Sequence, residues 1–391
     1  MNSNQVEQSQ QNPSFKASIV LTAARTGGAK TVEKVVKPFN ERLLPLFNKT
    51  RFQEAAAVIA AAGASSVISE PKDLQEKVNF FALAGGAGKR FEKLAHTIGD
   101  YTKINLPFRV DEDTNIHMLD FAMANGKFFI GDNVESQVAT VRLGTLGEIV
   151  DHYLKGNEVK ETIICCGDNV FADSAEEIMP FFVKAMNNPN THLALVGVER
   201  TPEEVADNFG VLKVKKNDGG NTYALQGFEE KPPKEVAEAM AIDGKNIANT
   251  GLLYMSKEAM IKLLDEIKGG VNNIKKNDEE PYDFALACKY IHKQVPEWFG
   301  LDPDKASTVL CVKKWEDVGN PNAMYQFLND VKGGTYLSNF PKEYAQKVQT
   351  AFADRVHLDA QTPYILFTPT TDVSQEKIQN ATSIEGVNIV V

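Results

Sequence analysis

The residues of this chain that are best suited to chemistry lie in the stretch FALAGGAGKR, residues 81–90. Its three glycines, Gly85, Gly86 and Gly88, follow an apolar run and come just before the cation Arg90. Glycines let backbone N–H groups approach an oxyanion, and a helix N-terminus adds a favourable potential for negative charge. The stretch therefore indicates a phosphate-binding loop at the end of a strand.

This loop matches neither of two common phosphate-binding motifs. A Walker A loop needs glycine where this chain has Leu83, and serine or threonine where it has Arg90. A dinucleotide-binding fingerprint needs a third glycine where the chain has Phe91, which argues against a cofactor-binding oxidoreductase. The alternative that the glycines only form a tight turn between a strand and a helix stays open.

Further charged residues stand at the borders of apolar runs. Lys103 precedes an apolar stretch, and Asp168 follows the longer run TIICC. The tripeptide Gly-Asp-Asn occurs at 131–133 and again at 167–169. We favour Asp168 over Asp132 as the candidate functional aspartate, because the longer apolar run suits a central strand. An aspartate after a strand can also be a helix cap, which is the alternative role for Asp168.

The elements that must position these residues alternate between strands and helices from residue 79 onward. Strands are expected at VNFFALAGG, ETIICCGDN and HLALVGVER, and helices at SAEEIMPFFVKAM, TPEEVADNF and SKEAMIKLLDEIKGG. This alternation predicts an α/β fold with a mostly parallel sheet sandwiched by helices. Ligands of such sheets bind beyond the carboxyl ends of the strands, where LAGG and CCGD both lie.

Capping residues set the expected helix ends. Ser174 with Glu177 forms a capping-box pattern, and Thr201 is expected as an N-cap ahead of a proline in the first turn. The helix that begins at Ser256 is expected to stop at Gly269.

The composition of the 391 residues disfavours some classes of binding partner. The chain has 42 basic and 52 acidic residues, and its net charge of −10 disfavours a nucleic-acid surface or an anionic membrane surface. No apolar stretch approaches the roughly 20 residues of a membrane span, and the polar start does not resemble a signal peptide. A cytoplasmic protein is expected, and its four cysteines show no zinc-binding spacing.

Six further motifs follow the glycine loop in order. They are RLGTLGEI (142–149), CCGDNVFAD (165–173), DNFGVLKV (207–214), GFEEKPP (227–233), IANTGLLYM (247–255) and WEDVGNP (315–321). Together with Leu-Ala-Gly-Gly-x-Gly-x-Arg at 83–90, this set resembles the nucleoside-diphosphate-sugar pyrophosphorylases. These are sugar-1-phosphate nucleotidyltransferases with a Rossmann-like catalytic domain, and the resemblance spans about 79–330.

Composition and periodicity predict the terminal segments, and the resemblance implies the catalytic domain between them and its reaction. The segments are a disordered tail (1–15), a helical N-terminal extension (16–78), a Rossmann-like nucleotidyltransferase catalytic domain (79–332) and a small β-rich C-terminal tail (333–391). In the implied reaction, an oxygen of a sugar-1-phosphate attacks the α-phosphorus of an NTP, and pyrophosphate leaves. Positioning and charge neutralisation supply most of such catalysis, so no protein nucleophile is required.

The resemblance also implies roles for individual residues. Nucleotide-binding residues would be Leu83, Ala84, Gly85, Gly86, Gly88, Arg90, Gly144 and Thr145. Catalytic residues would be Arg90, Lys103, Asp168 and Lys231, and the sugar phosphate would contact Gly210, Glu230, Lys231 and Asn249. Asp168 and Asp317 would hold the implied cofactor Mg²⁺, a hard cation suited to carboxylates and phosphate oxygens.

Several alternatives stay open at this point. Glu230 and Lys231 could form a surface ion pair, and Asp317 could make an Asx hydrogen bond in a turn. The segment at 109–142 is shorter than the family usually has, and FEKLAHTIGDY replaces the family's Pro-Leu-Thr. A catalytically inactive homologue that binds sugar nucleotides as a regulatory subunit is the rival function. The base, the sugar, the role of 16–78 and the oligomeric state, a homo-oligomer included, are not readable from the sequence.

Overall fold

The computed structural model describes part of the chain. The described residues are 71–83, 107–109, 115–117, 136–139, 146–171, 175–217, 220–271, 273–275, 282–319, 323, 327, 330, 356–357, 364–366, 382–384 and 387–390. The predicted tail at 1–15 and most of the predicted extension at 16–78 lie outside them. The four predicted segment boundaries therefore stay predictions.

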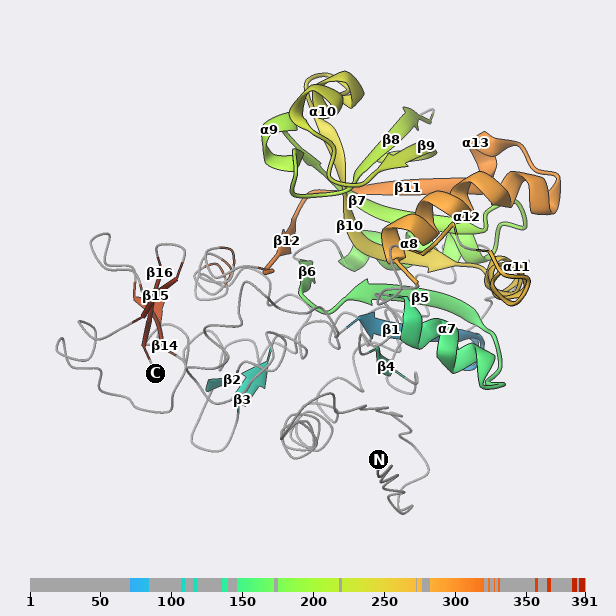
Figure 1. Ribbon diagram of the computed structural model, residues 1–391, viewed down its shortest axis with the longest axis horizontal. Coiled ribbons are helices and arrows are strands. Elements are labelled where there is room, and N and C mark those ends of the chain that lie inside the picture. The colour runs from blue at the N-terminus through green and yellow to red at the C-terminus, as the bar shows by residue number, and fades with distance from the viewer. Residues whose placement is uncertain are drawn as a thin grey trace, which may run out of the picture.

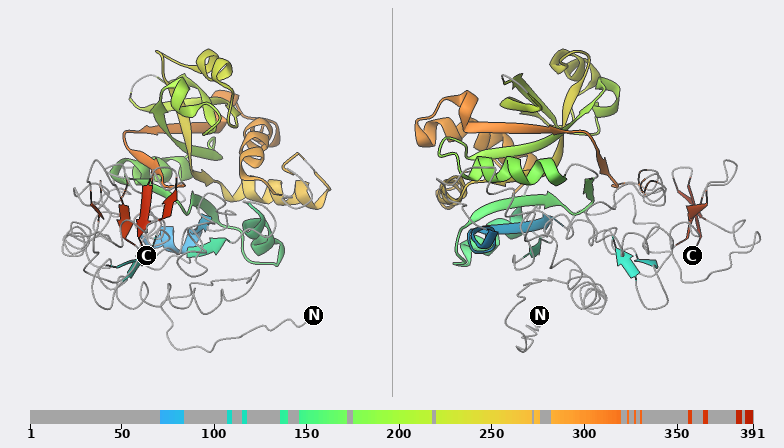
Figure 2. Two further views of the ribbon diagram at one scale, coloured as in Figure 1. Left: turned by 60° about the vertical axis from the view of Figure 1, so that its left-hand side comes forward. Right: turned by 180° about the vertical axis from the view of Figure 1, so that it is seen from behind.

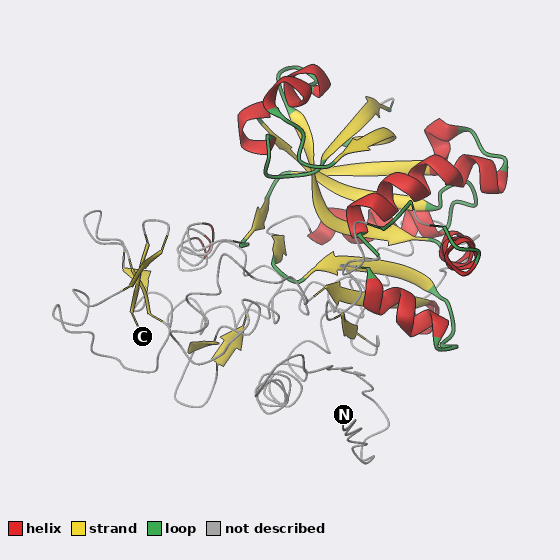
Figure 3. Cartoon of the chain, in the orientation of Figure 1, coloured by secondary structure: helices red, strands yellow, loops and turns green. Residues whose placement is uncertain are grey.

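The described elements are short helices and strands that follow one another along the chain (Figures 1 and 3). The helices are α4 (Pro71–Lys77), α7 (Gly147–Leu154), α8 (Ala175–Met186), α9 (Pro202–Val205), α10 (Lys234–Met240), α11 (Lys257–Lys268), α12 (Phe284–Phe299) and α13 (Pro303–Ala306). The strands of the central sheet are β1 (Val78–Leu83), β4 (Ser136–Ala139), β5 (Glu161–Cys166), β7 (Leu193–Arg200), β8 (Val211–Lys216), β9 (Thr222–Glu229), β10 (Asn246–Met255) and β11 (Ser307–Val312).

The central sheet is mixed rather than mostly parallel. Its strand order is β4-β1-β5-β10-β7-β11-β9-β8. The expected parallel pairing occurs between β1 and β4, between β1 and β5, and between β7 and β11. Strand β10 runs antiparallel to both β5 and β7, and β9 runs antiparallel to β8 and β11. The apolar runs predict the strands, but they do not indicate whether β9 and β10 run parallel or antiparallel to their neighbours.

Helices cover both faces of this sheet, as the alternation of strands and helices predicts. Phe81 and Leu253 belong to a buried cluster that includes residues of α7, α11 and α12. Phe80 is fully buried and faces the other side, because successive strand residues point to opposite faces. On that side Tyr254 packs against Phe182 of α8, with their ring centroids 6.4 Å apart. Figure 2 shows the same layers from two further directions.

The helix starts follow the predicted capping residues wherever the structure describes them. Thr201 and Glu204 form a reciprocal capping box at the start of α9, with Pro202 in its first turn. Ser256 caps α11 by accepting a hydrogen bond from a backbone N–H, and Gly269 ends that helix. The cap predicted at Ser174 lies outside the described residues.

The strand starts at Val78, Glu161 and Leu193 form one edge of the sheet, called here the amino edge. There the Glu161 carboxylate accepts hydrogen bonds from the Tyr254 hydroxyl at 2.7 Å and from the Lys257 N–H at 3.1 Å. Lys257 is the first residue of α11, so Glu161 ties that helix to the sheet. Burial is the main cause that raises the pKa of Glu161 from 4.5 to about 7.

Three smaller sheets complete the described structure. Strands β6 (Asn169–Phe171) and β12 (Trp315–Asp317) pair with each other, and so do β2 (Pro107–Arg109) and β3 (Asn115–His117). Near the C-terminus, β13 (Val356–His357), β14 (Tyr364–Leu366), β15 (Thr382–Ile384) and β16 (Val387–Val390) form a sheet in the order β13-β14-β16-β15. Among the described helices, none has the length and apolar character needed to cross a membrane.

Candidate active site

The ends of β1, β5 and β7, at Leu83, Cys166 and Arg200, form the opposite edge of the sheet, called here the carboxyl edge. Leu83 and Cys166 are partners in the parallel β1–β5 ladder. Just beyond them, the Gly167 N–H donates a hydrogen bond to the Leu83 carbonyl at 2.8 Å. The last described residue before the glycine loop therefore lies beside the turn that carries Asp168.

Strand pairing brings the two candidate metal ligands together. Asp317 of β12 is the antiparallel partner of Asn169 of β6, and the Val318 N–H donates to the Asp168 carbonyl at 3.1 Å. The Asp317 carboxylate also accepts a hydrogen bond from the Gly319 N–H at 2.7 Å. The Asx turn that the sequence left open as an alternative is therefore present, and it engages Oδ1 of this carboxylate.

Three of the candidate sugar-binding residues also meet at the carboxyl edge. The Asn249 N–H donates to the Gly210 carbonyl at 2.8 Å. A Cβ atom at Gly210 would lie 2.8 Å from Oε2 of Glu230 and 2.7 Å from Cζ of Phe228, so no larger residue fits there without displacing them. Gly210, Glu230 and Asn249 thus come from three different strands or loops and form one group.

Lys231 follows Glu230 in an unusual backbone conformation. Its φ is +47°, which lies in the left-handed region that residues other than glycine rarely adopt. The next residue, Pro232, accepts a hydrogen bond through its carbonyl from the Asp207 N–H at 3.0 Å. Asp207 is left-handed as well, with φ of 58°. Strained residues occur at functional sites, but Asp243, in the turn between Ile242 and Lys245, also has a positive φ of 52°, so the role of Lys231 stays a prediction.

A bulge in β10 lies between two sets of candidate residues. One is the group Gly210, Glu230 and Asn249, called here the sugar-side group, and the other is the pair Asp168 and Asp317. Asn249 and Leu252 pair with consecutive residues of β7, so Thr250 and Gly251 project from the ladder. Gly251 has φ of +73°, and a Cβ atom on it would lie 2.6 Å from Sγ of Cys166. The side chain of Asn169 donates a hydrogen bond to the Thr250 carbonyl. Only glycine fits this approach of β10 to the end of β5.

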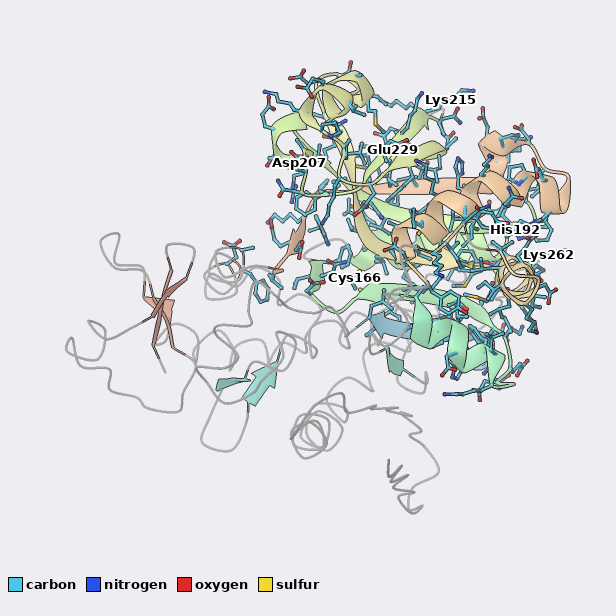
Figure 4. The ribbon with its side chains drawn as sticks, viewed as in Figure 1. Cys166, His192, Asp207, Lys215, Glu229 and Lys262 are labelled. Carbon is cyan, nitrogen blue, oxygen red and sulfur yellow. The ribbon has the colours of Figure 1, made fainter. Side chains whose placement is uncertain are left out.

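Figure 4 shows the two edges of the sheet through individual side chains. Cys166 and Asp207 lie towards the carboxyl edge, near β6, β12 and α9, whereas His192 and Lys262 lie at the opposite end. The buried thiol of Cys165 has a raised pKa, mainly because of burial and secondly because of the negative charge of Asp168. Cys165 therefore stays protonated and is unsuited to act as a nucleophile.

The two candidate metal ligands at the carboxyl edge, Asp168 and Asp317, are both carboxylates, the ligand type that suits a magnesium ion. Within the described ranges, no group of three or more histidine, cysteine, aspartate or glutamate side chains could hold a metal. Mg²⁺ is usually bound by one or two carboxylates together with substrate phosphates. Asp168 and Asp317 would supply such a pair.

The nucleotide side of the predicted site lies outside the described residues. This applies to Ala84, Gly85, Gly86, Gly88, Arg90, Lys103, Gly144 and Thr145, and to the alternative metal ligand Asp132. Their roles stay predictions. Sequence reasoning missed Arg200, Thr250 and Gly251. A glycine inside a strand pattern indicates a bulge and could have revealed Gly251, whereas no sequence signal marks Arg200.

The described structure defines an α/β fold with a mixed central sheet, and such a fold alone does not determine a function. The particular family follows from the sequence. The model of the nucleotidyl transferase family matches residues 101–333, more than half of the chain, so this chain belongs to that family. The resemblance is thereby confirmed at family level. The matched segment begins after the glycine loop at 83–90.

Searches with the whole chain gave similar solved structures but no match among curated proteins. A mannose-1-phosphate geranyltransferase from Thermus thermophilus is 15% identical, with a TM-score of 0.43 over 64% of this chain and 78% of that one. A UDP-glucose pyrophosphorylase complexed with UDP-glucose is 15% identical, with a TM-score of 0.44 over 71% and 99%. An apo UDP-glucose pyrophosphorylase is 18% identical, with a TM-score of 0.44 over 63% and 94%. Family membership rests on the sequence match.

Proposed function

We propose that this protein transfers a nucleotidyl group from an NTP to a sugar-1-phosphate and releases pyrophosphate. Membership of the nucleotidyl transferase family supports the transfer itself. The observation that supports a sugar-1-phosphate as the acceptor is that Gly210, Glu230 and Asn249 lie together at the carboxyl edge. Lys231 stands directly beside this group and supplies a cation for the acceptor's phosphate.

The proposed chemistry needs no covalent intermediate. A phosphate oxygen of the sugar-1-phosphate forms a bond to the α-phosphorus, and the bond from that phosphorus to the β-phosphate's bridging oxygen breaks. Pyrophosphate leaves with the electron pair, and the products are an NDP-sugar and pyrophosphate. The contribution of the protein is to align the two anions and to neutralise their charge.

Each part of the site has a role in this proposal. The Lys231 ammonium neutralises the phosphate of the sugar, and the Glu230 carboxylate accepts a hydrogen bond from a sugar hydroxyl. Asp168 and Asp317 hold Mg²⁺. When bound, this ion neutralises charge on the phosphates. Asn249 stays rigid for sugar contact because its backbone N–H is bound to Gly210.

The nucleotide is proposed to bind where β1 ends. Strand β1 leads at Leu83 into the glycine loop, and the Gly167–Leu83 hydrogen bond holds that point beside Asp168. Backbone N–H groups of Gly85, Gly86 and Gly88 would then bind the triphosphate. In the same proposal, Arg90 and Lys103 neutralise the departing pyrophosphate and the α-phosphate, and Gly144 and Thr145 contact the base.

A pyrophosphate-release assay across NTPs and a panel of sugar-1-phosphates, with and without Mg²⁺, tests the proposal. Turnover with one pair is expected, and Lys231→Met should raise the KM for the sugar-1-phosphate. Asp168→Asn should lower kcat by about 100-fold or more, as is usual when a group that stabilises transition-state charge is removed. Lys215→Met is the matched control, because Lys215 is exposed and pairs with Asp304 on the surface.

Two outcomes would count against the proposal. An Asp168→Asn protein with the wild-type rate would refute the metal assignment. Measurable sugar-nucleotide binding without turnover for any pair would instead support the regulatory subunit as the function.

A further inference from the structure

The chain changes sheets between β11 and β12. The parallel ladder between β7 and β11 ends at the pair Val198 and Val312. Three residues later, Trp315 begins β12, which pairs with β6 instead of with the central sheet. Figure 1 shows β12 leaving the end of β11 towards β6. From Trp315 on, the described ladder of this segment is the one with β6, so its connection to the central sheet depends on side chains.

The side chain of Arg200 supplies that connection. Its Nη2 donates a hydrogen bond to the Trp315 carbonyl at 2.7 Å and lies 3.8 Å from Oε1 of Glu316. The guanidinium carbon lies 5.9 Å from the centre of the Trp315 ring. The Arg200 side chain is only 20% exposed, and hydrogen bonds from charged donors are the stronger ones.

The ring of Trp315 has no anchoring hydrogen bond of its own. Its side chain is buried, and in the part of the chain that the structure describes its Nε1 has no hydrogen-bond partner. Edge-to-face packing on Phe209, with centroids 5.4 Å apart, is its described aromatic contact. The ladder to β6, in which Trp315 pairs with Phe171, holds β12 on one side. The bond from Arg200 to the Trp315 carbonyl is the directional side-chain contact that ties the start of β12 to the end of β7.

Both sides of the candidate site connect to this one guanidinium. Asp317 follows Trp315 by two residues, and its strand pairs beside Asp168. Phe209, against which Trp315 packs, directly precedes Gly210 of the sugar-side group. We propose that Arg200 is a positioning residue that fixes β12 and so couples the placement of Asp317 to the sugar-side loop. This inference rests on the proposed function for the role of Asp317, but the anchoring of Trp315 stands independently of it.

Tryptophan fluorescence can report on this anchoring because the chain has two tryptophans. Trp298 lies on α12, away from the carboxyl edge, so Trp298→Phe gives a parent protein in which Trp315 is the sole tryptophan. In this parent, Arg200→Met removes the charge and the donor at similar length. Arg200→Lys keeps one charged donor, and Lys215→Met is the control for losing an exposed cation. Thermal denaturation confirms that each protein is folded.

The first measurement needs neither substrate nor metal. Arg200→Met should shift the Trp315 emission to longer wavelength and increase its quenching by acrylamide. The emission and quenching of Arg200→Lys should lie between those of Arg200→Met and those of the parent. The second measurement is the Mg²⁺ dependence of this fluorescence and of pyrophosphate release. Arg200→Met should raise the half-saturating Mg²⁺ concentration about tenfold, the usual effect of losing one charge-assisted hydrogen bond. Excess Mg²⁺ should restore most of the turnover, which it would not do for general structural damage.

Two results would overturn the proposal. One is an Arg200→Met protein with the emission, quenching and Mg²⁺ half-saturation of the parent. The other is a protein in which Trp315 becomes exposed but the Mg²⁺ dependence is unchanged, which would refute the coupling. If Arg200→Met does not fold, the same comparisons with Arg200→Lys decide. A parent without turnover and without a Mg²⁺ response would refute the proposed function and the role of Asp317, while the quenching data would still test the anchoring of Trp315.

Discussion

Replacing Glu161 by glutamine should stabilise the fold at alkaline pH and leave it almost unchanged at acidic pH. Glu161 is 7% exposed, and burial raises the pKa of its carboxyl from 4.5 to about 7 in the folded protein. The folded state therefore holds this proton over a range of pH in which the unfolded chain has already released it.

The sign and size of the effect follow from this difference. Below pH 4.5 the carboxyl is protonated in both states and costs nothing. Between pH 4.5 and about 7 the free energy of unfolding falls with rising pH by up to about 1.4 kcal/mol per pH unit. Above that range the wild-type protein carries a constant penalty of about 3 kcal/mol, from a pKa difference of about 2.5.

Glutamine resembles the protonated carboxyl in shape and does not titrate. Its carbonyl can still accept the hydrogen bonds that the Tyr254 hydroxyl and the Lys257 N–H donate to Glu161. Glu161→Gln should match wild type at pH 5 to within about 1 kcal/mol. At pH 8 it should exceed wild type by up to about 3 kcal/mol.

Urea unfolding followed by tryptophan fluorescence at pH 5, 6, 7 and 8 measures this difference. Glu235→Gln changes an exposed carboxyl on α10 and should shift stability by less than about 0.5 kcal/mol at every pH. The reasoning fails if the advantage of Glu161→Gln over wild type does not grow between pH 5 and pH 8. It fails equally if the variant is the less stable protein at pH 8.

Three further substitutions test the geometry by urea unfolding and by substrate kinetics. Gly251→Ala should cost about 1–3 kcal/mol, because it strains a left-handed backbone and drives a methyl group against Cys166; an unchanged midpoint would contradict the bulge. Thr201→Ala should cost about 1 kcal/mol through the lost capping box of α9, and a neutral result would count against that cap. Gly210→Ala should displace the Glu230 carboxylate and raise the KM for the sugar-1-phosphate more than it lowers kcat. An unchanged KM would argue against a sugar contact there.

Much of the fold could be predicted from apolar periodicity and capping residues. The runs at β1, β5 and β7 have the length and composition of buried strands, and Thr201 and Ser256 mark helix starts through local chemistry. The mixed character of the sheet could not be predicted in this way. The directions of β9 and β10 depend on which neighbours they reach after a connection, and this is a property of the whole chain.

The candidate site residues were named through the family resemblance, and their roles stay predictions. The structure brings Gly210, Glu230 and Asn249 together, and it places Asp168 beside the strand of Asp317. Arg200 was not predictable, because an arginine at a strand end looks like any solvated cation until its partner, 115 residues away along the chain, is known.

The bulge in β10 inserts two residues, Thr250 and Gly251, and this number decides how the strand would respond to a deletion. Asn249 pairs with Gly197 and Leu252 with Val196, so the two inserted residues leave the inward and outward sides of β10 the same on both flanks. Removing a single residue there would leave a one-residue bulge, which bends the strand and increases its local twist without turning Asn249 to the other face. Removing both would restore a regular ladder with β7 and remove the contacts of Thr250 and Gly251 with Asn169 and Cys166, while the ladder of Leu252–Met255 with β5 would stay. Length changes at this point are therefore expected to alter the contacts with Cys166 and Asn169 rather than the faces of the strand.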